Sequence, residues 1–200
     1  FTVSGTVDGA GNQLTLNHGS PALDITGLIS GTGTQVVKTG SGTATLTAAN
    51  TFNGGLQIGE TNQAGNAGTV SIEHNTALGS GQLSYGSGGT LDLGVSGLTV
   101  GNNVFIGNRS DSSDYKIQLD LAGTATGELT GDIDIRKGTA GVFVTQVGAD
   151  DTLTLSGILK TGVGGGAGLT KTGAGTLVLS NANTYTGATT VSAGTLQLGD

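Results

Sequence analysis

Apolar residues recur along the whole chain in short alternating runs, in which two apolar side chains flank one residue. A period of two places the apolar side chains on one face of a β-strand. Glycine interrupts nearly every window of helical length and costs about 1 kcal/mol in a helix interior, so the chain is predicted to be all-β. The predicted strands centre on Leu14/Leu16, Leu23/Ile25, Ala44/Leu46, Leu56/Ile58, Val70/Ile72, Leu83/Tyr85, Leu91/Leu93, Leu98/Val100, Val104/Ile106, Leu119/Leu121, Ile133/Ile135, Val142/Val144, Leu153/Leu155, Leu177/Leu179 and Leu196/Leu198.

One stretch of the pattern occurs twice. Lys38 to Gly54 aligns without gaps with Lys171 to Gly187, and both read Lys-Thr-Gly-x-Gly-Thr, then Leu, then Ala-Asn-Thr, then Gly. Similarity continues on both sides, so the copies extend over about 23–72 and 153–198. The first copy carries extra residues near 60–66, which predicts a longer loop at that point.

Repetition of this kind favours a solenoid over a sandwich or a barrel, because each coil of a solenoid meets a near copy of itself. Three short strands per coil predict coils of roughly 22 to 30 residues, and therefore about seven to nine coils. We predict a single β-solenoid segment over residues 1–200. Because Phe1 already lies in a strand pattern without an initiator methionine, the segment is expected to belong to a longer chain.

The second copy resembles the autotransporter-associated β-strand repeat, also called the passenger-associated transport repeat. The residues that carry the resemblance are the Lys-x-Gly-x-Gly-Thr-Leu-x-Leu pattern that starts at Lys171, the Asn-x-Tyr-x-Gly pattern at Asn183, and the Thr-x-Val-x-x-Gly-x-Leu pattern that ends at Leu196. The first copy departs from it at Ala44 and Phe52. The resemblance implies a right-handed parallel β-helix that a C-terminal β-barrel of the same polypeptide exports across a Gram-negative outer membrane, so that it is extracellular or displayed at the cell surface.

The repeated residues have a structural explanation that needs no ligand. Glycine at Gly173, Gly175 and Gly187 can turn the backbone through positive φ at coil corners. Asn183 can bond its own turn or stack as an asparagine ladder on a neighbouring coil. Tyr185, or Phe52 in the first copy, is expected to cover a corner of the core.

Composition narrows the possible functions. The chain has no cysteine, which excludes disulfides and thiol chemistry. Its net charge of −7, with seven scattered Lys and Arg residues, argues against a nucleic-acid partner. No apolar run is long enough for a membrane-spanning helix, so membrane association would come only through the implied barrel.

Three aspartates flanked by apolar residues, Asp92, Asp120 and Asp134, are expected on the outer face of strands. Paired carboxylates of this kind cleave polysaccharides when they lie about 5 to 10 Å apart. The competing interpretation is a solvated outer face. No catalytic residue is assigned, because the sequence does not place these carboxylates on neighbouring coils.

Other candidate sites match known motifs poorly. Three acidic loops could offer oxygen ligands to calcium but lack the calcium-binding spacings. His18 and His74 are far apart in the sequence and no serine lies in a Gly-x-Ser-x-Gly motif, which argues against a catalytic triad. The glycine-rich stretch at 162–168 resembles a phosphate-binding loop but precedes a strand and not a helix. Asn108 begins a glycosylation sequon. No metal or cofactor residue is assigned. The acidic loops are Asp8 to Asn12, Asp111 to Asp114 and Asp150–Asp151.

Recognition is expected in loops, with the coils as scaffold. Asn108 to Lys116, the most polar run, and Glu60 to Asn66 are the candidates for contact with a host surface or a glycan. The predicted function is a non-enzymatic, surface-displayed passenger that acts as a rigid stalk or adhesive scaffold. One alternative is an extracellular fibre that self-associates through its solenoid ends, and a second is a polysaccharide-cleaving β-helix enzyme.

Overall fold

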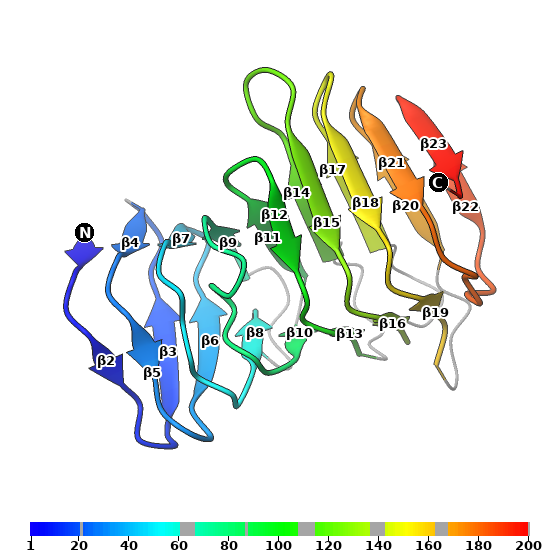
Figure 1. The fold of residues 1–200 in the computed structure, drawn as a ribbon. Helices are drawn as coiled ribbons and strands as arrows, with labels where there is room; N and C mark the ends of the chain where they lie inside the picture. The colour runs from blue at the N-terminus through cyan, green and yellow to red at the C-terminus, as the bar shows by residue number, and fades with distance from the viewer. Residues whose placement is uncertain are drawn as a thin grey trace.

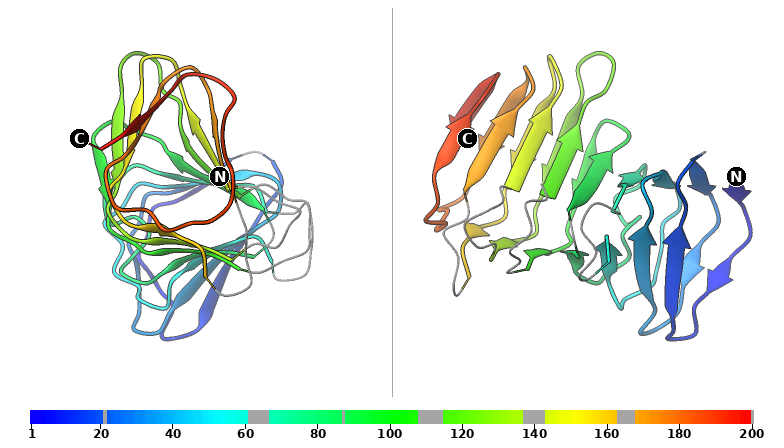
Figure 2. Two further views of the ribbon diagram at one scale, coloured as in Figure 1. Left: turned by 90° about the vertical axis from the view of Figure 1, so that its right-hand side faces the viewer. Right: turned by 180° about the vertical axis from the view of Figure 1, so that it is seen from behind.

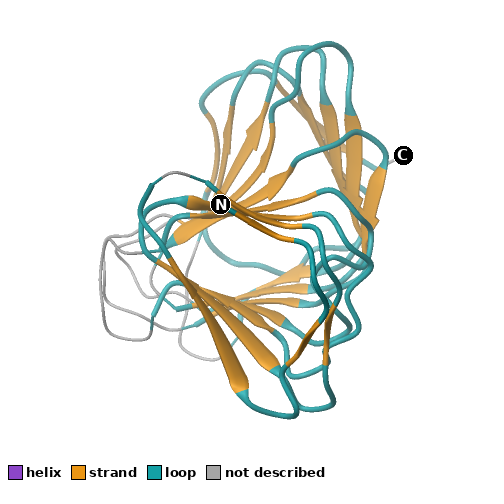
Figure 3. Cartoon of the chain, turned by 90° about the vertical axis from the view of Figure 1, so that its left-hand side faces the viewer, coloured by secondary structure: helices purple, strands orange, loops and turns teal. Residues whose placement is uncertain are grey.

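The computed structural model describes residues 1–20, 22–60, 67–86, 88–107, 115–136, 143–162 and 168–199. Within these ranges every regular element is a β-strand, and Figure 3 shows strands joined only by turns and loops. The all-β prediction is confirmed. No helix of a length and apolarity that could cross a membrane occurs in these ranges.

The strands stack in parallel and form the sides of a solenoid (Figure 1). The nine-stranded sheet consists of β1 (Thr2–Val3), β4 (Leu23–Ile25), β7 (Thr43–Leu46), β9 (Thr69–Ile72), β11 (Gly89–Leu93), β14 (Tyr115–Leu119), β17 (Phe143–Val147), β20 (Leu169–Thr172) and β22 (Thr189–Val191). The seven-stranded sheet consists of β3 (Gln13–Asn17), β6 (Gln35–Thr39), β8 (Leu56–Ile58), β10 (Leu83–Tyr85), β13 (Val104–Ile106), β16 (Ile133–Ile135) and β19 (Leu159–Lys160).

The third side changes along the axis. At the start it is a two-stranded sheet of β2 (Val7–Asp8) and β5 (Ile29–Ser30), and turns replace strands in the next two coils. From the middle of the chain it is a five-stranded sheet, and the end-on view in Figure 2 shows the two halves of the solenoid offset from each other. This sheet consists of β12 (Leu98–Val100), β15 (Thr126–Leu129), β18 (Thr152–Leu155), β21 (Thr176–Leu179) and β23 (Thr195–Leu198).

Successive turns pair in register. Gln118 pairs with Gln146 and Lys171 with Val191, a span of 28 residues in the first case and 20 in the second. The nine-stranded sheet has one strand for each turn, so the prediction of seven to nine coils is confirmed for the described part of the chain. The coils are slightly shorter than predicted, because some have only two strands.

The core lies inside the coil and is built from columns of aliphatic side chains. Val70, Leu91 and Ile117 follow one another in register and are fully buried. The outward residues between them are polar, such as Ser71 and Asp92. Stacking of this kind gives every inward residue an apolar neighbour above and below, which explains why an alternating sequence with few aromatic residues can bury a continuous core.

Two strand predictions need correction. The run around Val144 was predicted to point Val142 and Val144 inward, but Phe143, Thr145 and Val147 form the inward column and Val142 lies outside the described residues. Three consecutive apolar residues leave the alternation undecided, and the partner strands set it. Leu121 lies beyond the end of its strand.

The last strand departs from its prediction in burial. Leu198 is 75% exposed and Leu196 is partly buried, because β23 pairs with β21 on one side only within the described residues.

Candidate functional site

The repeat motif begins with a lysine that points into the core. Lys38, on β6, is fully buried between Leu16 and Ile58 of the adjacent turns. Its Nζ donates hydrogen bonds to the carbonyl oxygens of Thr39 (2.6 Å) and Gly40 (2.7 Å) at the corner that follows the strand. The aliphatic stem therefore completes an apolar column while the amine satisfies carbonyl groups of the turn.

The second copy builds the same corner. Nζ of Lys171, on β20, bonds the carbonyl oxygens of Thr172 (2.7 Å) and Gly173 (2.8 Å), and that of Ala193 (3.2 Å) from the next turn. Burial lowers the pKa of both lysines, to about 8 for Lys38. A buried amine bonded only to main-chain carbonyls serves the fold, and nothing in this arrangement presents it to a substrate.

The glycines of the motif have two different roles. Gly173 turns the corner with φ of 75°, and its counterpart Gly40 has φ of 76°. The prediction of positive φ was wrong for Gly175 and Gly187. Gly175 is required for close approach, since a Cβ there would lie 2.0 Å from the carbonyl oxygen of Gly148 on the preceding turn.

The asparagine of the motif bonds the main chain of the neighbouring turn. Asn50 Oδ1 accepts from the Ile29 amide (2.8 Å), and Asn50 Nδ2 donates to the Ala77 carbonyl (2.7 Å), so one side chain joins three successive turns. Asn183 Oδ1 accepts from the Leu159 amide (2.7 Å). Neither asparagine forms the predicted ladder or bonds its own turn in these contacts.

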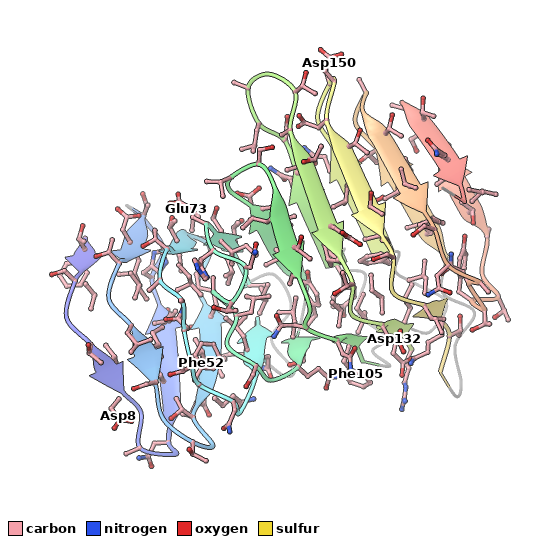
Figure 4. The ribbon with its side chains drawn as sticks, viewed as in Figure 1. Asp8, Phe52, Glu73, Phe105, Asp132 and Asp150 are labelled. Atoms are coloured by element: carbon pink, nitrogen blue, oxygen red, sulfur yellow. The ribbon has the colours of Figure 1, made fainter. Side chains whose placement is uncertain are left out.

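The aromatic residue after the asparagine covers the corner as predicted. Phe52 is fully buried, and Tyr185 is partly buried and packs against the core. Figure 4 shows Phe52 within the N-terminal half of the solenoid. The residues of the repeat therefore turn the chain at a corner of the coil and stack that corner on the neighbouring turn.

The two copies occupy different sides of the solenoid. Lys38 lies in the seven-stranded sheet and β7 after it in the nine-stranded sheet, whereas Lys171 lies in the nine-stranded sheet and β21 after it in the five-stranded sheet. The second copy is thus rotated by one side. Sequence similarity gave no indication of this rotation, because the motif specifies its own corner and not its position around the axis.

The three candidate catalytic aspartates do not form one site. Asp92 accepts a hydrogen bond from Ser71 Oγ (2.8 Å), and its pKa is raised by burial, against the Ser71 bond, with a further contribution from Asp120. Asp120 follows the next strand of the same sheet. Asp134 lies in the seven-stranded sheet, in an ion pair with Arg136 (2.8 Å). This arrangement favours the solvated outer face.

The acidic loops considered for calcium have main-chain partners. Asp8 Oδ1 accepts from the Ala10 amide (2.9 Å), and the buried Asp151 accepts from the amides of Leu121 (3.0 Å) and Ala125 (2.8 Å) on the preceding turn. Figure 4 shows Asp8 and Asp150 far apart. Among the residues that the structure describes, no cluster of three metal-ligating side chains occurs. Asp111 to Asp114 lie outside the described residues.

The remaining sequence candidates are scattered or undescribed. His18 and His74 follow strands of different sheets on different turns. Three segments fall outside the described residues, namely 61–66 of the Glu60 to Asn66 run, 108–114 of the Asn108 to Lys116 run with its sequon, and 163–167 of the glycine-rich stretch. Tyr115 and Lys116, predicted to belong to a projecting loop, instead begin β14. Tyr115 is fully buried and meets Tyr85 edge to face at 5.7 Å, so that part of the loop prediction was wrong.

The outer face of the seven-stranded sheet has a charged end. Phe105 on β13 is followed in register by Asp134, and the Arg136 guanidinium lies 5.2 Å from the Phe105 ring centre. Lys160 Nζ lies 2.7 Å from Asp132 Oδ2, and this hydrogen bond, with one from the Ile158 amide, lowers the pKa of Asp132. Arg136 thus pairs with Asp134 and Lys160 with Asp132, although Asp134 Oδ1 is buried without a hydrogen-bond partner. Figure 4 shows Phe105 and Asp132 along the same side of the rod.

The other end of that face is polar and hollowed. A hollow of about 400 Å³ lies over β3, β6 and β8, and its lining is hydroxyl, amide and carboxylate groups with one valine. The lining residues are Gln13, Thr15, Gln35, Val37, Thr39, Gln57 and Glu60. Sequence analysis did not assemble it, because its residues come from three turns, although Thr39 belongs to the repeat motif and Glu60 begins one of the candidate loops. The uninterrupted recurrence of Gln and Thr at outward positions was the available signal.

Comparisons with known proteins agree with the structural interpretation of the repeat. The passenger-associated-transport-repeat family model matches residues 36–60 and 169–198, which contain both lysine corners. The chain is 37% identical over 196 residues to the adhesin BmaC autotransporter of Brucella suis biovar 1 (strain 1330). That match covers 98% of this chain and 5% of the relative's length. No solved structure matches the chain. The predicted resemblance is confirmed.

Proposed function

We propose that this chain, which carries two passenger-associated transport repeats, is a rigid section of an adhesive passenger displayed outside a Gram-negative bacterium. The observation that carries the proposal is the similarity to an autotransporter adhesin along almost the whole chain, and not only in the repeats. In this role the chain is a scaffold without catalytic activity.

Three features of the described residues support the scaffold role. Parallel pairing links every turn to its neighbours, from β1 to β22 in the longest sheet. The buried lysines and Asn50 tie corners together across turns. Polar groups on the outer strands are largely engaged with one another, as in the Ser71 to Asp92 and Arg136 to Asp134 pairs. Such a structure holds binding groups at fixed positions along a rod.

The proposal is tested by display and by adhesion. Antibodies raised against the purified chain should label intact cells of the source bacterium, and beads coated with the chain should bind cultured host cells. The matched control is Leu177→Asp, which places a charge in the core and should unfold the adjoining turns. Beads carrying the wild-type chain that bind no better than the unfolded control, or antibodies that label only lysed cells, would contradict the proposal.

A further inference from the structure

The turn that carries the first repeat contains a pair of residues that can react with each other. Asn53 is followed by Gly54, and this is the one asparagine–glycine pair in the sequence. Because glycine has no side chain, its amide nitrogen can approach the side-chain carbonyl carbon of the preceding asparagine more freely than that of any other residue. Asparagine is one of the thermolabile residues of proteins. The second copy has Thr186 in place of Asn53 and lacks the pair.

The reaction of this pair is deamidation, and it needs no partner except water. The Gly54 nitrogen loses its proton and attacks Cγ of Asn53, the side-chain nitrogen leaves as ammonia, and a five-membered succinimide ring forms. Water then opens the ring at either carbonyl carbon, which leaves aspartate or isoaspartate at position 53. Asn53 and Gly54 are both exposed, so water and hydroxide reach them in the folded chain. Burial therefore does not protect the pair.

Hydrogen bonds to the preceding turn do protect it. The Gly54 amide donates to the carbonyl oxygen of Thr34 (2.9 Å), so the proton that must leave is engaged. Asn53 Oδ1 accepts from the Gly33 amide (2.6 Å). The first bond must break before the nitrogen can act as a nucleophile, and the second restricts the side-chain rotation that brings Cγ onto this nitrogen. Deamidation thus requires that the turn open locally.

The same stacking explains why glycine stands at position 54. A Cβ there would lie 2.5 Å from the carbonyl oxygens of both Gly33 and Thr34. The fold therefore excludes any side chain that would shield the Gly54 nitrogen. The close approach of two turns requires the residue that makes the pair labile once these turns separate.

We propose that Asn53 is a self-modification site, which is protected while its turn is stacked and deamidates after the turn has opened. Isoaspartate adds one methylene group to the main chain. It would displace the bond from the Val36 amide to the Gly55 carbonyl (2.9 Å) and the pairing of Val36 with Leu56. A turn modified in this way does not restack as before, whereas the second copy, with Thr186, recloses. The inference does not depend on the adhesive function.

The test follows the mass of the peptide that contains position 53. The purified chain is incubated at mildly alkaline pH, folded in buffer or unfolded in guanidinium chloride, and peptide mass spectrometry measures conversion of the amide to a carboxylate. Conversion at Asn53 should be at least about tenfold slower in the folded chain, because its rate follows the population of the open turn. Equal rates in both states would overturn the protection, and an unfolded chain that converts Asn53 no faster than Asn181, which precedes alanine, would overturn the site.

Two variants connect the reaction to this turn. Asn50→Ala removes bonds to the Ile29 amide and the Ala77 carbonyl, so it should speed conversion of Asn53 several-fold while circular dichroism still shows a folded chain. Asn53→Thr copies the second repeat, and it should abolish the conversion and restore full refolding after long incubation in denaturant. An unchanged rate in Asn50→Ala, or a loss of refolding that persists in Asn53→Thr, would contradict the proposal.

Discussion

The two repeat copies form the same corner in different surroundings. In each, a turn returns to its starting side after 20 residues, from Lys38 to Ile58 and from Lys171 to Val191. The first copy is enclosed by turns on both sides, and Asn50 bonds both of them. The second lies near the last strands, where Asn183 bonds the preceding turn and Val191 is 46% exposed. The comparison teaches that the motif encodes local geometry, while the neighbouring turns determine how much it stabilises.

Their different positions around the axis teach a second point. The copies begin on different sides of the three-sided coil, Lys38 in the seven-stranded sheet and Lys171 in the nine-stranded sheet, so they are not separated by a whole number of turns. This spacing is possible because the corner requires only a preceding turn to stack on. The lysine, the Gly40 or Gly173 turn and the close-approach glycine act together on two of the three sides of the coil. A repeat of this type can therefore recur along a passenger without fixed spacing.

The largest loss of stability is expected from substitutions of Leu177, a position at which the two copies differ. Leu177 is fully buried and its counterpart is the smaller Ala44. Leu177→Asp should cost more than about 4 kcal/mol and unfold the adjoining turns, because an unpaired charge would be buried. Leu177→Ala, which copies the first repeat, should cost about 2 to 4 kcal/mol. Urea denaturation followed by circular dichroism measures both, and an unchanged midpoint for Leu177→Asp would refute its burial.

The two buried lysines should contribute differently to the free energy of unfolding. Lys38→Met keeps the stem but removes the donor to the carbonyls of Thr39 and Gly40, so it should cost about 2 kcal/mol. Lys171→Met should cost less, about 1 kcal/mol, because the carbonyls it bonds, including that of Ala193, lie at a part-buried corner where water can reach them once the amine is removed. The same denaturation measurement checks both. Equal losses would show that burial of the corner does not matter.

Asn50 and Asn183 should also differ in how much each stabilises its copy of the repeat. Asn50→Ala removes bonds to two turns and should cost about 2 kcal/mol, whereas Asn183→Ala removes one bond to Leu159 and should cost about 1 kcal/mol. Hydrogen exchange of the Ile29 and Leu159 amides, which lose their acceptors, would locate the effect. Protection that persists at Ile29 in Asn50→Ala would contradict the assigned bond.

The smallest effect is a pH dependence that belongs to the first copy. The pKa of Lys38 is lowered from 10.5 to about 8 by burial, so between these values the unfolded chain binds more protons than the folded chain. The free energy of unfolding should therefore rise as pH increases from about 8 to 10, by on the order of 1 kcal/mol. Above pH 10 the raised pKa of buried Tyr85 acts in the opposite direction. Lys38→Met should flatten the rise, and a rise that survives in this variant would assign it to another group.

The sequence predicted the class of fold well because most inward positions are aliphatic. Alternation at residues such as Leu91 and Leu93 is sufficient to locate a strand and its buried face. Among the strands of the repeats that escaped prediction, β6 and β20 did so because their inward pairs are Val36 with Lys38 and Leu169 with Lys171. Lysine counts as polar in a pattern, whereas its stem is apolar and its amine found carbonyl partners at the corner.

The candidate site was less predictable for a different reason. A hollow depends on which turn lies beside which, and the lengths of turns, which vary between 19 and 29 residues, cannot be read from outward residues such as Gln13 or Gln35. Loop residues were favoured for recognition, and one of them, Tyr115, belongs to the core. Its position before an alternating strand pattern was the signal that it would be buried.

The stacking of whole turns gives the rod a mechanical property. Hydrogen bonds between turns run along the axis, so a pull along the axis separates one pair of strands after another, as a zipper opens. Each released turn of 19 to 29 residues extends to roughly 65 to 100 Å, at about 3.5 Å per residue, in place of the roughly 4.8 Å it occupied in the stack. We expect force spectroscopy to record a series of small steps of this length. If such a rod tethers a bacterium to a surface, it would lengthen turn by turn under the force of flow before it breaks.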